Sequence, residues 1–199
     1  FALVTGDMEV YSPAARRAFE KYGIPCFVDE KHSLFMNPFI EYIRSAVDMA
    51  VENFTYESVF RFLRCGLTDI TEEETDRLEN YVIAMGIRGL DRWDQEWVRS
   101  YRGEDPEECV KLNPVRQRLV DMWRPFAEGL KSPQGTIRTC CQALYEFICR
   151  NQIEKKLKLY EEGFTAAGEM AMAKEYSQIY QIVMDLLDKL VEVLGDEQV

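Results

Sequence analysis

The residue types that usually carry enzyme chemistry are scarce in this chain. His32 is the only histidine among the 199 residues, so any scheme that needs two imidazoles is excluded. The sequence contains no Gly-x-x-x-x-Gly-Lys-Ser/Thr phosphate loop, no His-Glu-x-x-His motif and no Gly-x-Ser-x-Gly motif. Carboxylates are plentiful, but the run Glu72, Glu73 and Glu74 stands at a predicted helix start, where capping is the usual role. We therefore predict no catalytic residue in this chain.

The cysteines lack the spacing of a metal site. They stand at positions 26, 65, 109, 140, 141 and 149, without a Cys-x-x-Cys pair. Cys140 and Cys141 point in different directions on one predicted helix, and Cys149 lies more than two turns further on, so the three cannot surround one ion. We predict six reduced cysteines, most of them packed as small apolar side chains, and no metal ligand.

The acidic net charge of the chain is compatible only with local contacts to nucleic acid. The formal net charge is −11, whereas a nucleic-acid-binding domain normally carries a basic face. Residues that could contact DNA are Arg16, Arg17, Lys31 and His32. Exposed helix faces and polar loops produce the same pattern without any ligand, and that interpretation is favoured for His32.

Further along the chain, two other groups have a binding interpretation and a structural one. Arg116 and Arg118 could touch phosphates, or could lie on a solvated helix face. Trp93 and Trp97 could form a platform on which bases stack. Their helical spacing favours packing in a core.

The N-terminal stretch is the only part of the chain that predicts β-strands. Apolar runs near residues 2–5 and 25–29 each end in polar residues, as is typical of strands buried on both faces. Between them we expect a helix capped by Ser12, beginning at Pro13 and ending at Gly23. Strand, helix and strand in this order predict a parallel βαβ unit.

The rest of the chain shows the periodicity of helices. Helix starts are expected at Asn37-Pro38, at Thr55, at the capping box of Thr71 and Glu74, and at Asn113-Pro114. Residues 100–113 predict an exposed loop, and residues 114–195 a helical bundle with its own core. The predicted fold class is mainly α, and α+β overall because of the small parallel βαβ piece.

Residues 1–90 resemble a known family. The words that carry this resemblance are Val-Thr-Gly-Asp, Arg-Arg-Ala-Phe, Gly-Ile-Pro-Cys-Phe, Asn-Pro-Phe-Ile-Glu-Tyr-Ile-Arg-Ser-Ala and Tyr-Glu-Ser-Val-Phe-Arg-Phe-Leu-Arg. Their order is similar to the start of the second motor domain of UvrD-type helicases, and the wording is closer still to the AddB-type (RexB-type) proteins of bacterial AddAB helicase–nucleases. The resemblance implies a partial RecA-like motor domain over residues 1–52. Over residues 53–199 it implies a helical insertion like the 2B domain of UvrD-type helicases.

The resemblance also implies that this motor is degenerate. In active UvrD-type motors the first strand is followed by a Tyr that stacks on adenine and an Arg that reaches the phosphates. Here Thr5 and Gly6 stand in those places, and neither can stack on a base or stabilise phosphoryl transfer. A non-catalytic segment is expected, which scaffolds the passage of DNA in an enzyme of double-strand break repair and recombination. The isolated chain is expected to be inactive.

For the parent complex the resemblance implies further components. These are ATP, Mg²⁺, an iron–sulfur cluster whose cysteines lie outside the matched region, an AddA-type helicase–nuclease subunit and DNA. The chain itself reads as a piece of a longer protein, cytoplasmic and without a membrane span. Composition alone supports a different class of function, an acidic helical adaptor that binds a protein partner and has no role with nucleic acid.

Overall fold

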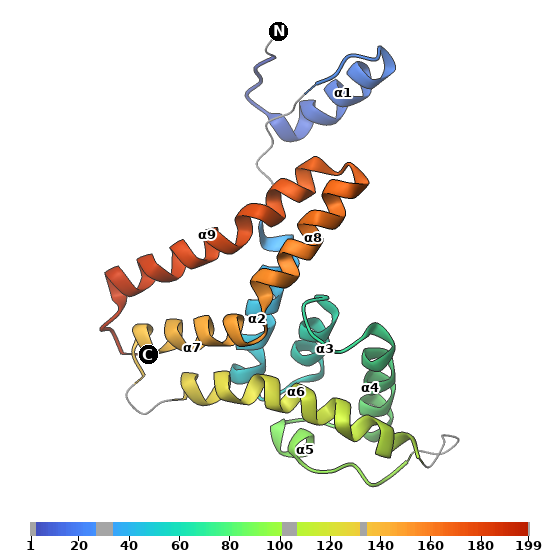
Figure 1. Cartoon of the computed structure of the whole chain (residues 1–199), viewed down its shortest axis with the longest axis vertical. Coiled ribbons are helices and arrows are strands. Elements are labelled where there is room, and N and C mark those ends of the chain that lie inside the picture. Colours follow the sequence, from blue (N-terminus) through green and yellow to red (C-terminus); the bar gives the residue numbers. More distant parts are fainter. Residues whose placement is uncertain (1–2, 27–33, 101–106, 132–134, 199) are drawn as a thin grey trace. The chain divides into compact units, whose positions relative to one another are not determined.

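The computed structural model describes residues 3–26, 34–100, 107–131 and 135–198, and they are mainly helical, as predicted (Figure 1). The chain divides into two compact units, Phe1–Leu34 and Phe35–Val199. Within the described ranges the only β-pairing is an isolated antiparallel bridge between Thr136 and Gln198. No helix in those ranges is long and apolar enough to cross a membrane.

In the described residues 3–26 of the first unit the chain forms the helix α1 (Met8–Lys21), which begins earlier than predicted. Its N-cap is Asp7, whose side chain accepts a hydrogen bond from the backbone N–H of Val10 at 3.1 Å. The predicted cap, Ser12, therefore lies inside the helix together with Pro13, whose fixed φ is compatible with a helix at the cost of one hydrogen bond. Gly23, with φ +64°, follows the end of the helix as predicted.

The strands predicted on either side of α1 are not formed in the described residues. Leu3 and Val4 are 71% and 90% exposed and adopt no regular structure, and neither do Pro25 and Cys26. The remainder of the second run, residues 27–29, lies outside the described residues. A parallel strand obtains its hydrogen bonds from neighbouring strands, and no such neighbour exists among the described residues.

The second unit opens with helices that begin where their capping residues predict. Asn37 accepts from the N–H of Phe39 at 2.9 Å, and Thr55 accepts from that of Ser58 at 3.3 Å. Thr71 forms the predicted capping box. A short 3-10 turn (Leu34–Met36) precedes them, and the helices are α2 (Pro38–Val51), α3 (Tyr56–Arg64), α4 (Glu72–Met85) and the short α5 (Leu90–Asp94).

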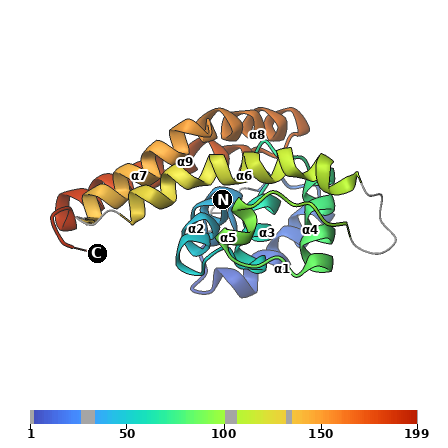
Figure 2. The same cartoon turned by 90° about the horizontal axis from the view of Figure 1, so that it is seen from below.

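Helix α6 (Glu108–Leu130) starts before the predicted Asn113-Pro114 cap. Cys109 and Leu112 are buried, so the apolar stripe extends upstream into the stretch that the sequence assigned to a loop. The Asn113 side chain is not a cap because it hydrogen-bonds the backbone of Trp97. Seen from below, α6 runs between the group α2–α5 and the last three helices (Figure 2).

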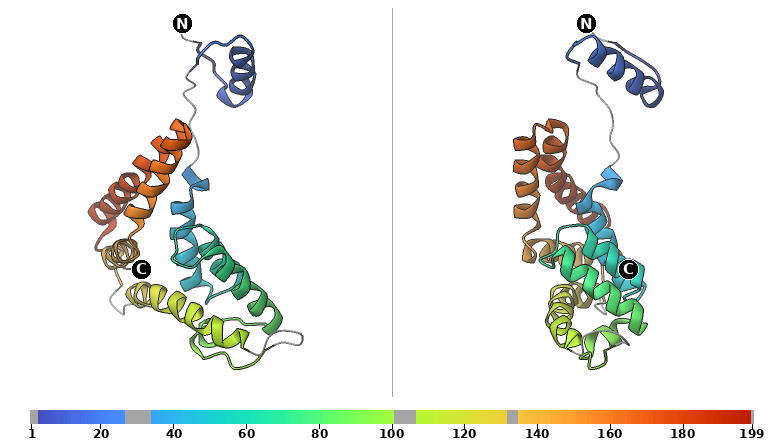
Figure 3. Two further views of the ribbon diagram at one scale, coloured as in Figure 1. Left: turned by 45° about the vertical axis from the view of Figure 1, so that its right-hand side comes forward. Right: turned by 90° about the vertical axis from the view of Figure 1, so that its right-hand side faces the viewer.

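The last three helices are α7 (Ile137–Arg150), α8 (Ile153–Ala167) and α9 (Met170–Leu194). Helices α8 and α9 form an antiparallel hairpin, and α7 packs against α6 and α9 (Figure 3). The chain after α9 returns to the start of α7, where the N–H groups of Ile137 and Arg138 donate to the carbonyls of Glu197 and Gly195, each at 3.0 Å. These contacts use N–H groups that have no partner within α7 itself.

Aromatic residues fill the core of this second unit. Tyr42 of α2 lies 4.8 Å from Phe62 of α3 and 5.2 Å from Phe147 of α7, measured between ring centroids. The Trp123 ring meets Phe54 edge-on at 4.6 Å, and its indole N–H donates to the Ala46 carbonyl at 3.0 Å. Because one set of contacts joins α2, α3, α6 and α7, these helices share one core.

Candidate functional site

The positions predicted for a degenerate nucleotide site form a capping turn. Thr5 Oγ1 accepts a hydrogen bond from the Asp7 N–H at 3.2 Å, and the Asp7 carboxylate accepts from Val10 in turn. A helix N-terminus attracts anions, and here the Asp7 carboxylate already occupies it. At Gly6, no atom of the described residues lies within 4 Å of the place that a Cβ would take. The described turn therefore presents a carboxylate at the start of α1, which disfavours a phosphate group there.

The predicted DNA-contact residues do not form a basic surface in the described part of the chain. Arg16 and Arg17 are exposed on α1, where successive residues face different directions. The Nε of Arg17 donates to the Pro13 carbonyl at 3.2 Å, which holds this guanidinium along its own helix. Lys31 and His32 lie outside the described residues.

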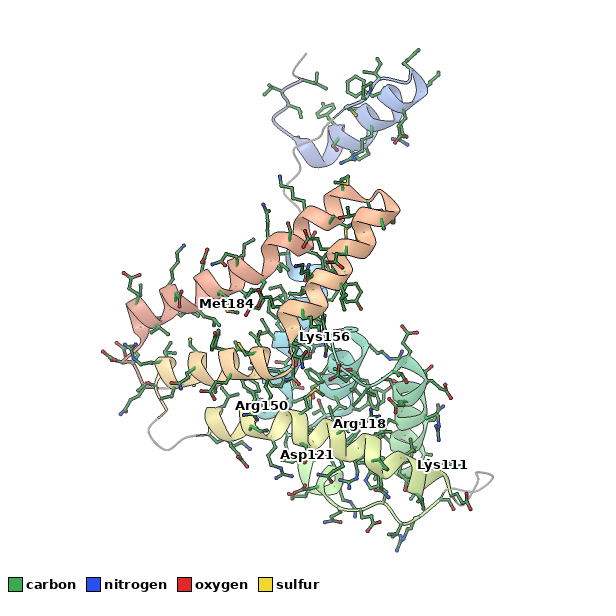
Figure 4. All side chains as sticks on the ribbon, viewed as in Figure 1. Lys111, Arg118, Asp121, Arg150, Lys156 and Met184 are labelled. Carbon is green, nitrogen blue, oxygen red and sulfur yellow. The ribbon has the colours of Figure 1, made fainter. Side chains whose placement is uncertain are left out.

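Arg116 and Arg118, the residues of α6 that could have touched phosphates, have structural roles. Arg116 is only 5% exposed, and its guanidinium donates to the Trp93 carbonyl and, at 3.1 Å, to Asn113 Oδ1. Burial lowers the pKa of Arg116, against the opposing effect of Asp94 and other nearby carboxylates. Arg118 pairs with Glu74 of α4, and Figure 4 labels it on the side-chain view.

The tryptophan pair belongs to the core. Trp93 and Trp97 are both buried, with ring centroids 5.3 Å apart, and Tyr81 stacks on Trp97 at 4.7 Å. Trp97 lies beyond the end of α5, where Asn113 holds its backbone. A base cannot stack on rings that protein atoms already cover, so the packing interpretation is the correct one.

The cysteines offer no donor set for the iron–sulfur cluster that the resemblance implies for the parent complex. Their thiols are free in this structure. Across the described ranges, no group of three or more His, Cys, Asp or Glu side chains is arranged to hold a metal ion. Burial raises the pKa of the Cys65 thiol to about 12, which keeps it protonated and unreactive.

Sequence reasoning missed a hollow of about 710 Å³ in the second unit. The α2–α3 loop and the turn after α4 line it, and two residues of that loop, Asn53 and Phe54, have φ of 56° and 57°. Non-glycine residues seldom adopt positive φ, although Asn does so more readily than most. In the sequence, Asn53 is therefore a weak indication of a loop with positive φ, and Phe54 gives no such indication.

The fold and these residues define a class: a mainly α-helical protein whose second unit has its own aromatic core. No model of a known protein family matches the chain. Curated relatives do match it. A protein of Lachnoclostridium phytofermentans, named as the B subunit of an ATP-dependent helicase/deoxyribonuclease, is 45% identical over 98% of the chain. Proteins of the same name from Clostridium botulinum (strain Hall) and Acetivibrio thermocellus are 39% and 38% identical over 100% and 98% of the chain.

The chain therefore matches, over nearly its whole length, a segment of proteins named as ATP-dependent helicase/deoxyribonuclease B subunits. It spans 17 to 18% of the length of these relatives. The resemblance expected from residues 1–90 is confirmed, and the similarity extends over nearly the whole chain.

Proposed function

We propose that this chain is a non-catalytic, helicase-like segment of the B subunit of an ATP-dependent helicase/deoxyribonuclease. The observation that carries the proposal is the match to proteins of that name at 38 to 45% identity over 98 to 100% of the chain. The Thr5-Gly6-Asp7 turn supports the non-catalytic part, because a carboxylate occupies the helix N-terminus that would otherwise attract phosphate.

Within such a subunit, residues 1–52 correspond to part of a RecA-like motor domain and residues 53–199 to a helical insertion of the 2B type. The apolar runs near residues 2–5 and 25–29 would become parallel strands once the remaining strands of that motor lie beside them. Exposed Leu3 and Val4 support this proposal, since apolar strand residues are normally buried in a parallel sheet.

The role we propose is to scaffold the passage of DNA during double-strand break repair and recombination, in the cytoplasm. ATP, Mg²⁺ and the iron–sulfur cluster would be held by other parts of the assembly, which includes an AddA-type helicase–nuclease subunit. Arg16, Arg17, Lys31 and His32 remain the candidate DNA contacts of this segment.

Two assays of the 199-residue chain test the absence of catalysis. ATP hydrolysis and DNA cleavage should not exceed those of a control preparation purified in the same way from cells that lack the chain. Turnover above this control that survives repurification would contradict the proposal.

A further assay addresses DNA binding. A chain of charge −11 repels a phosphate backbone, and only a few local cations oppose this. In fluorescence anisotropy at moderate salt, we expect the affinity for a labelled single-stranded oligonucleotide to be weaker than the roughly 10⁻⁴ to 10⁻⁶ M of non-specific binding. A dissociation constant below about 1 μM would reveal a binding surface of the segment itself.

The alternative function is an acidic helical adaptor for a protein partner. The net charge of −11 and the aromatic core shared by α2, α3, α6 and α7 favour it, since both are compatible with a segment that folds around its own core. Gel filtration of the chain with its flanking subunit domains, with and without DNA, separates the two functions. The adaptor would assemble equally well without DNA.

A further inference from the structure

The hollow of about 710 Å³ in the second unit is formed by two connections that meet side by side. One is the loop from Glu52 to Thr55, between α2 and α3. The other is the turn from Gly86 to Gly89, after α4. Neither connection contributes to the Thr5-Gly6-Asp7 turn or to any other candidate site described above.

The walls of the hollow are held in place. Phe54 is fully buried, with its ring 5.8 Å from Trp93 and 4.6 Å from Trp123. The Gly89 N–H donates to the Phe54 carbonyl at 3.4 Å, and the Leu90 N–H donates to Asn53 Oδ1 at 3.3 Å. These contacts maintain the two left-handed residues and keep both connections at a fixed separation.

The lining of the hollow is partly apolar. It includes Val82, which is buried, and Ile83 of the same helix, which is 61% exposed. It also includes Tyr56, which is half-buried with its ring 5.0 Å from that of Phe60. An aliphatic chain that enters the hollow would cover apolar surface that otherwise faces water.

The electrostatics of the hollow favour a cation. It lies at the C-terminal ends of α2 and α4, neither of which has a basic residue in its last turn. The N-terminal end of α3 also borders it, and Glu57 in the first turn of α3 offsets the positive partial charge there. A helix C-terminus carries roughly half a negative charge. Glu52 and Glu57 add two carboxylates, and Glu57 has no ion-pair partner among the described residues. Arg88 is the only lysine or arginine along the lining.

From this combination we infer that the hollow is a docking site for a basic segment of a partner protein, which inserts a lysine or arginine side chain. The aliphatic part of that side chain lies on Ile83 and Tyr56, and its charged end reaches Glu52 and Glu57. This mode of burial suits long cationic side chains, which keep the charged end in water. Phosphate groups are disfavoured by the two carboxylates and by the C-terminal ends of α2 and α4, so DNA is not the occupant.

Fluorescence anisotropy of the 199-residue chain with a labelled (Arg-Ala)₄ peptide at physiological salt tests the inference. The variant Glu52→Gln/Glu57→Gln should bind at least about fivefold more weakly, since each exposed pair contributes up to about 1 kcal/mol. The matched control Glu72→Gln/Glu73→Gln removes two carboxylates at the start of α4, away from the hollow, and should change affinity less than about twofold. Equal loss in both variants would mean diffuse attraction to an acidic surface and would overturn the inference.

Two further measurements separate the hollow from its alternatives. Ile83→Trp fills the hollow from an exposed position and keeps both carboxylates, so it should also weaken binding. A (citrulline-Ala)₄ peptide has nearly the same shape without the charge and should not bind measurably. Equal binding of the two peptides, or self-association of the chain through the hollow that Ile83→Trp abolishes, would contradict a basic partner segment.

Discussion

The two units of the chain differ in where their apolar side chains lie. In Phe35–Val199 the large apolar residues Phe39, Phe62 and Trp123 are fully buried. In Phe1–Leu34 the apolar Leu3, Val4 and Ile24 are exposed. The two regions show that an apolar run predicts burial only when its partners are present.

The reason lies in how helices and strands satisfy their backbones. A helix makes its hydrogen bonds internally, so α2 and α3 need only an apolar face and a cap to form. A parallel strand depends on neighbours that are distant in sequence. The helical unit can therefore assemble from its own residues, whereas the N-terminal runs need strands that the described part of the chain does not contain.

The strongest test of this difference is to remove a core residue from the second unit. Trp123→Ala should lower the free energy of unfolding by about 3 to 5 kcal/mol, because it creates a cavity and leaves the Ala46 carbonyl without its indole donor. Urea unfolding followed by circular dichroism measures this. Val4→Ala, at an exposed residue of the first unit, should change it by less than about 0.5 kcal/mol. If Trp123→Ala fails to fold, Trp123→Phe should lower the free energy of unfolding by a smaller amount. Equal effects of Val4→Ala and Trp123→Phe on this free energy would contradict the difference between the two units.

The next largest loss of stability is expected where a side chain of α6 hydrogen-bonds the backbone of the segment after α5. The Asn113 side chain accepts from the Trp97 N–H at 2.9 Å and donates to the Trp97 carbonyl at 2.8 Å. Asn113→Ala leaves both groups without their partner, so we expect a loss of about 2 kcal/mol in the free energy of unfolding. Asn80→Ala, at an exposed position of α4, is the control. A loss below that of the control would show that water replaces the Asn113 amide at no cost.

Several elements of the fold could be predicted from sequence because their chemistry is local. The caps Asn37, Thr55 and Thr71 are confirmed as helix starts, since an N-cap depends on residues two or three positions away. The starts of α1 and α6 were predicted too late. Ser12-Pro13 and Asn113-Pro114 satisfy the same rule, and only tertiary burial decides between competing caps.

The candidate sites were harder to predict than the helices. An arginine on a helix has the same sequence pattern whether it faces a phosphate or a buried carbonyl, so the structural role of Arg116 follows only from its contacts with Trp93 and Asn113. The hollow depends on the positive φ of Asn53 and Phe54, which the burial of Phe54 imposes. Such long-range causes leave little trace in a local pattern.

A smaller effect should appear in the pH dependence of the second unit. Burial raises the pKa of Glu74, but hydrogen bonds from Thr71 and Arg118 outweigh it, so the pKa of this carboxyl is lowered overall. A lowered pKa in the folded state stabilises the protein above the unfolded pKa of about 4.3, and this stabilisation is lost as the pH falls through the folded value. Glu74→Gln should therefore be less stable than the wild type by about 0.5 to 1 kcal/mol at pH 7, and the difference should shrink below about pH 4. Urea unfolding from pH 7 to pH 3 measures it, with Glu73→Gln as control, and a difference that is constant with pH would contradict the role of the ionised carboxylate.

The smallest effect is expected from a cap in the first unit. All three tryptophans, at positions 93, 97 and 123, lie in the second unit, so their fluorescence reports on its unfolding alone. Asp7→Ala removes the cap of α1 and should reduce the protection of the Val10 amide from hydrogen exchange, yet leave the fluorescence midpoint in urea unchanged. Thr55→Ala removes the cap of α3 and should shift that midpoint by the equivalent of about 1 kcal/mol. A midpoint shift of similar size in Asp7→Ala would mean that α1 unfolds together with the helical unit, and the two regions would then be one cooperative structure.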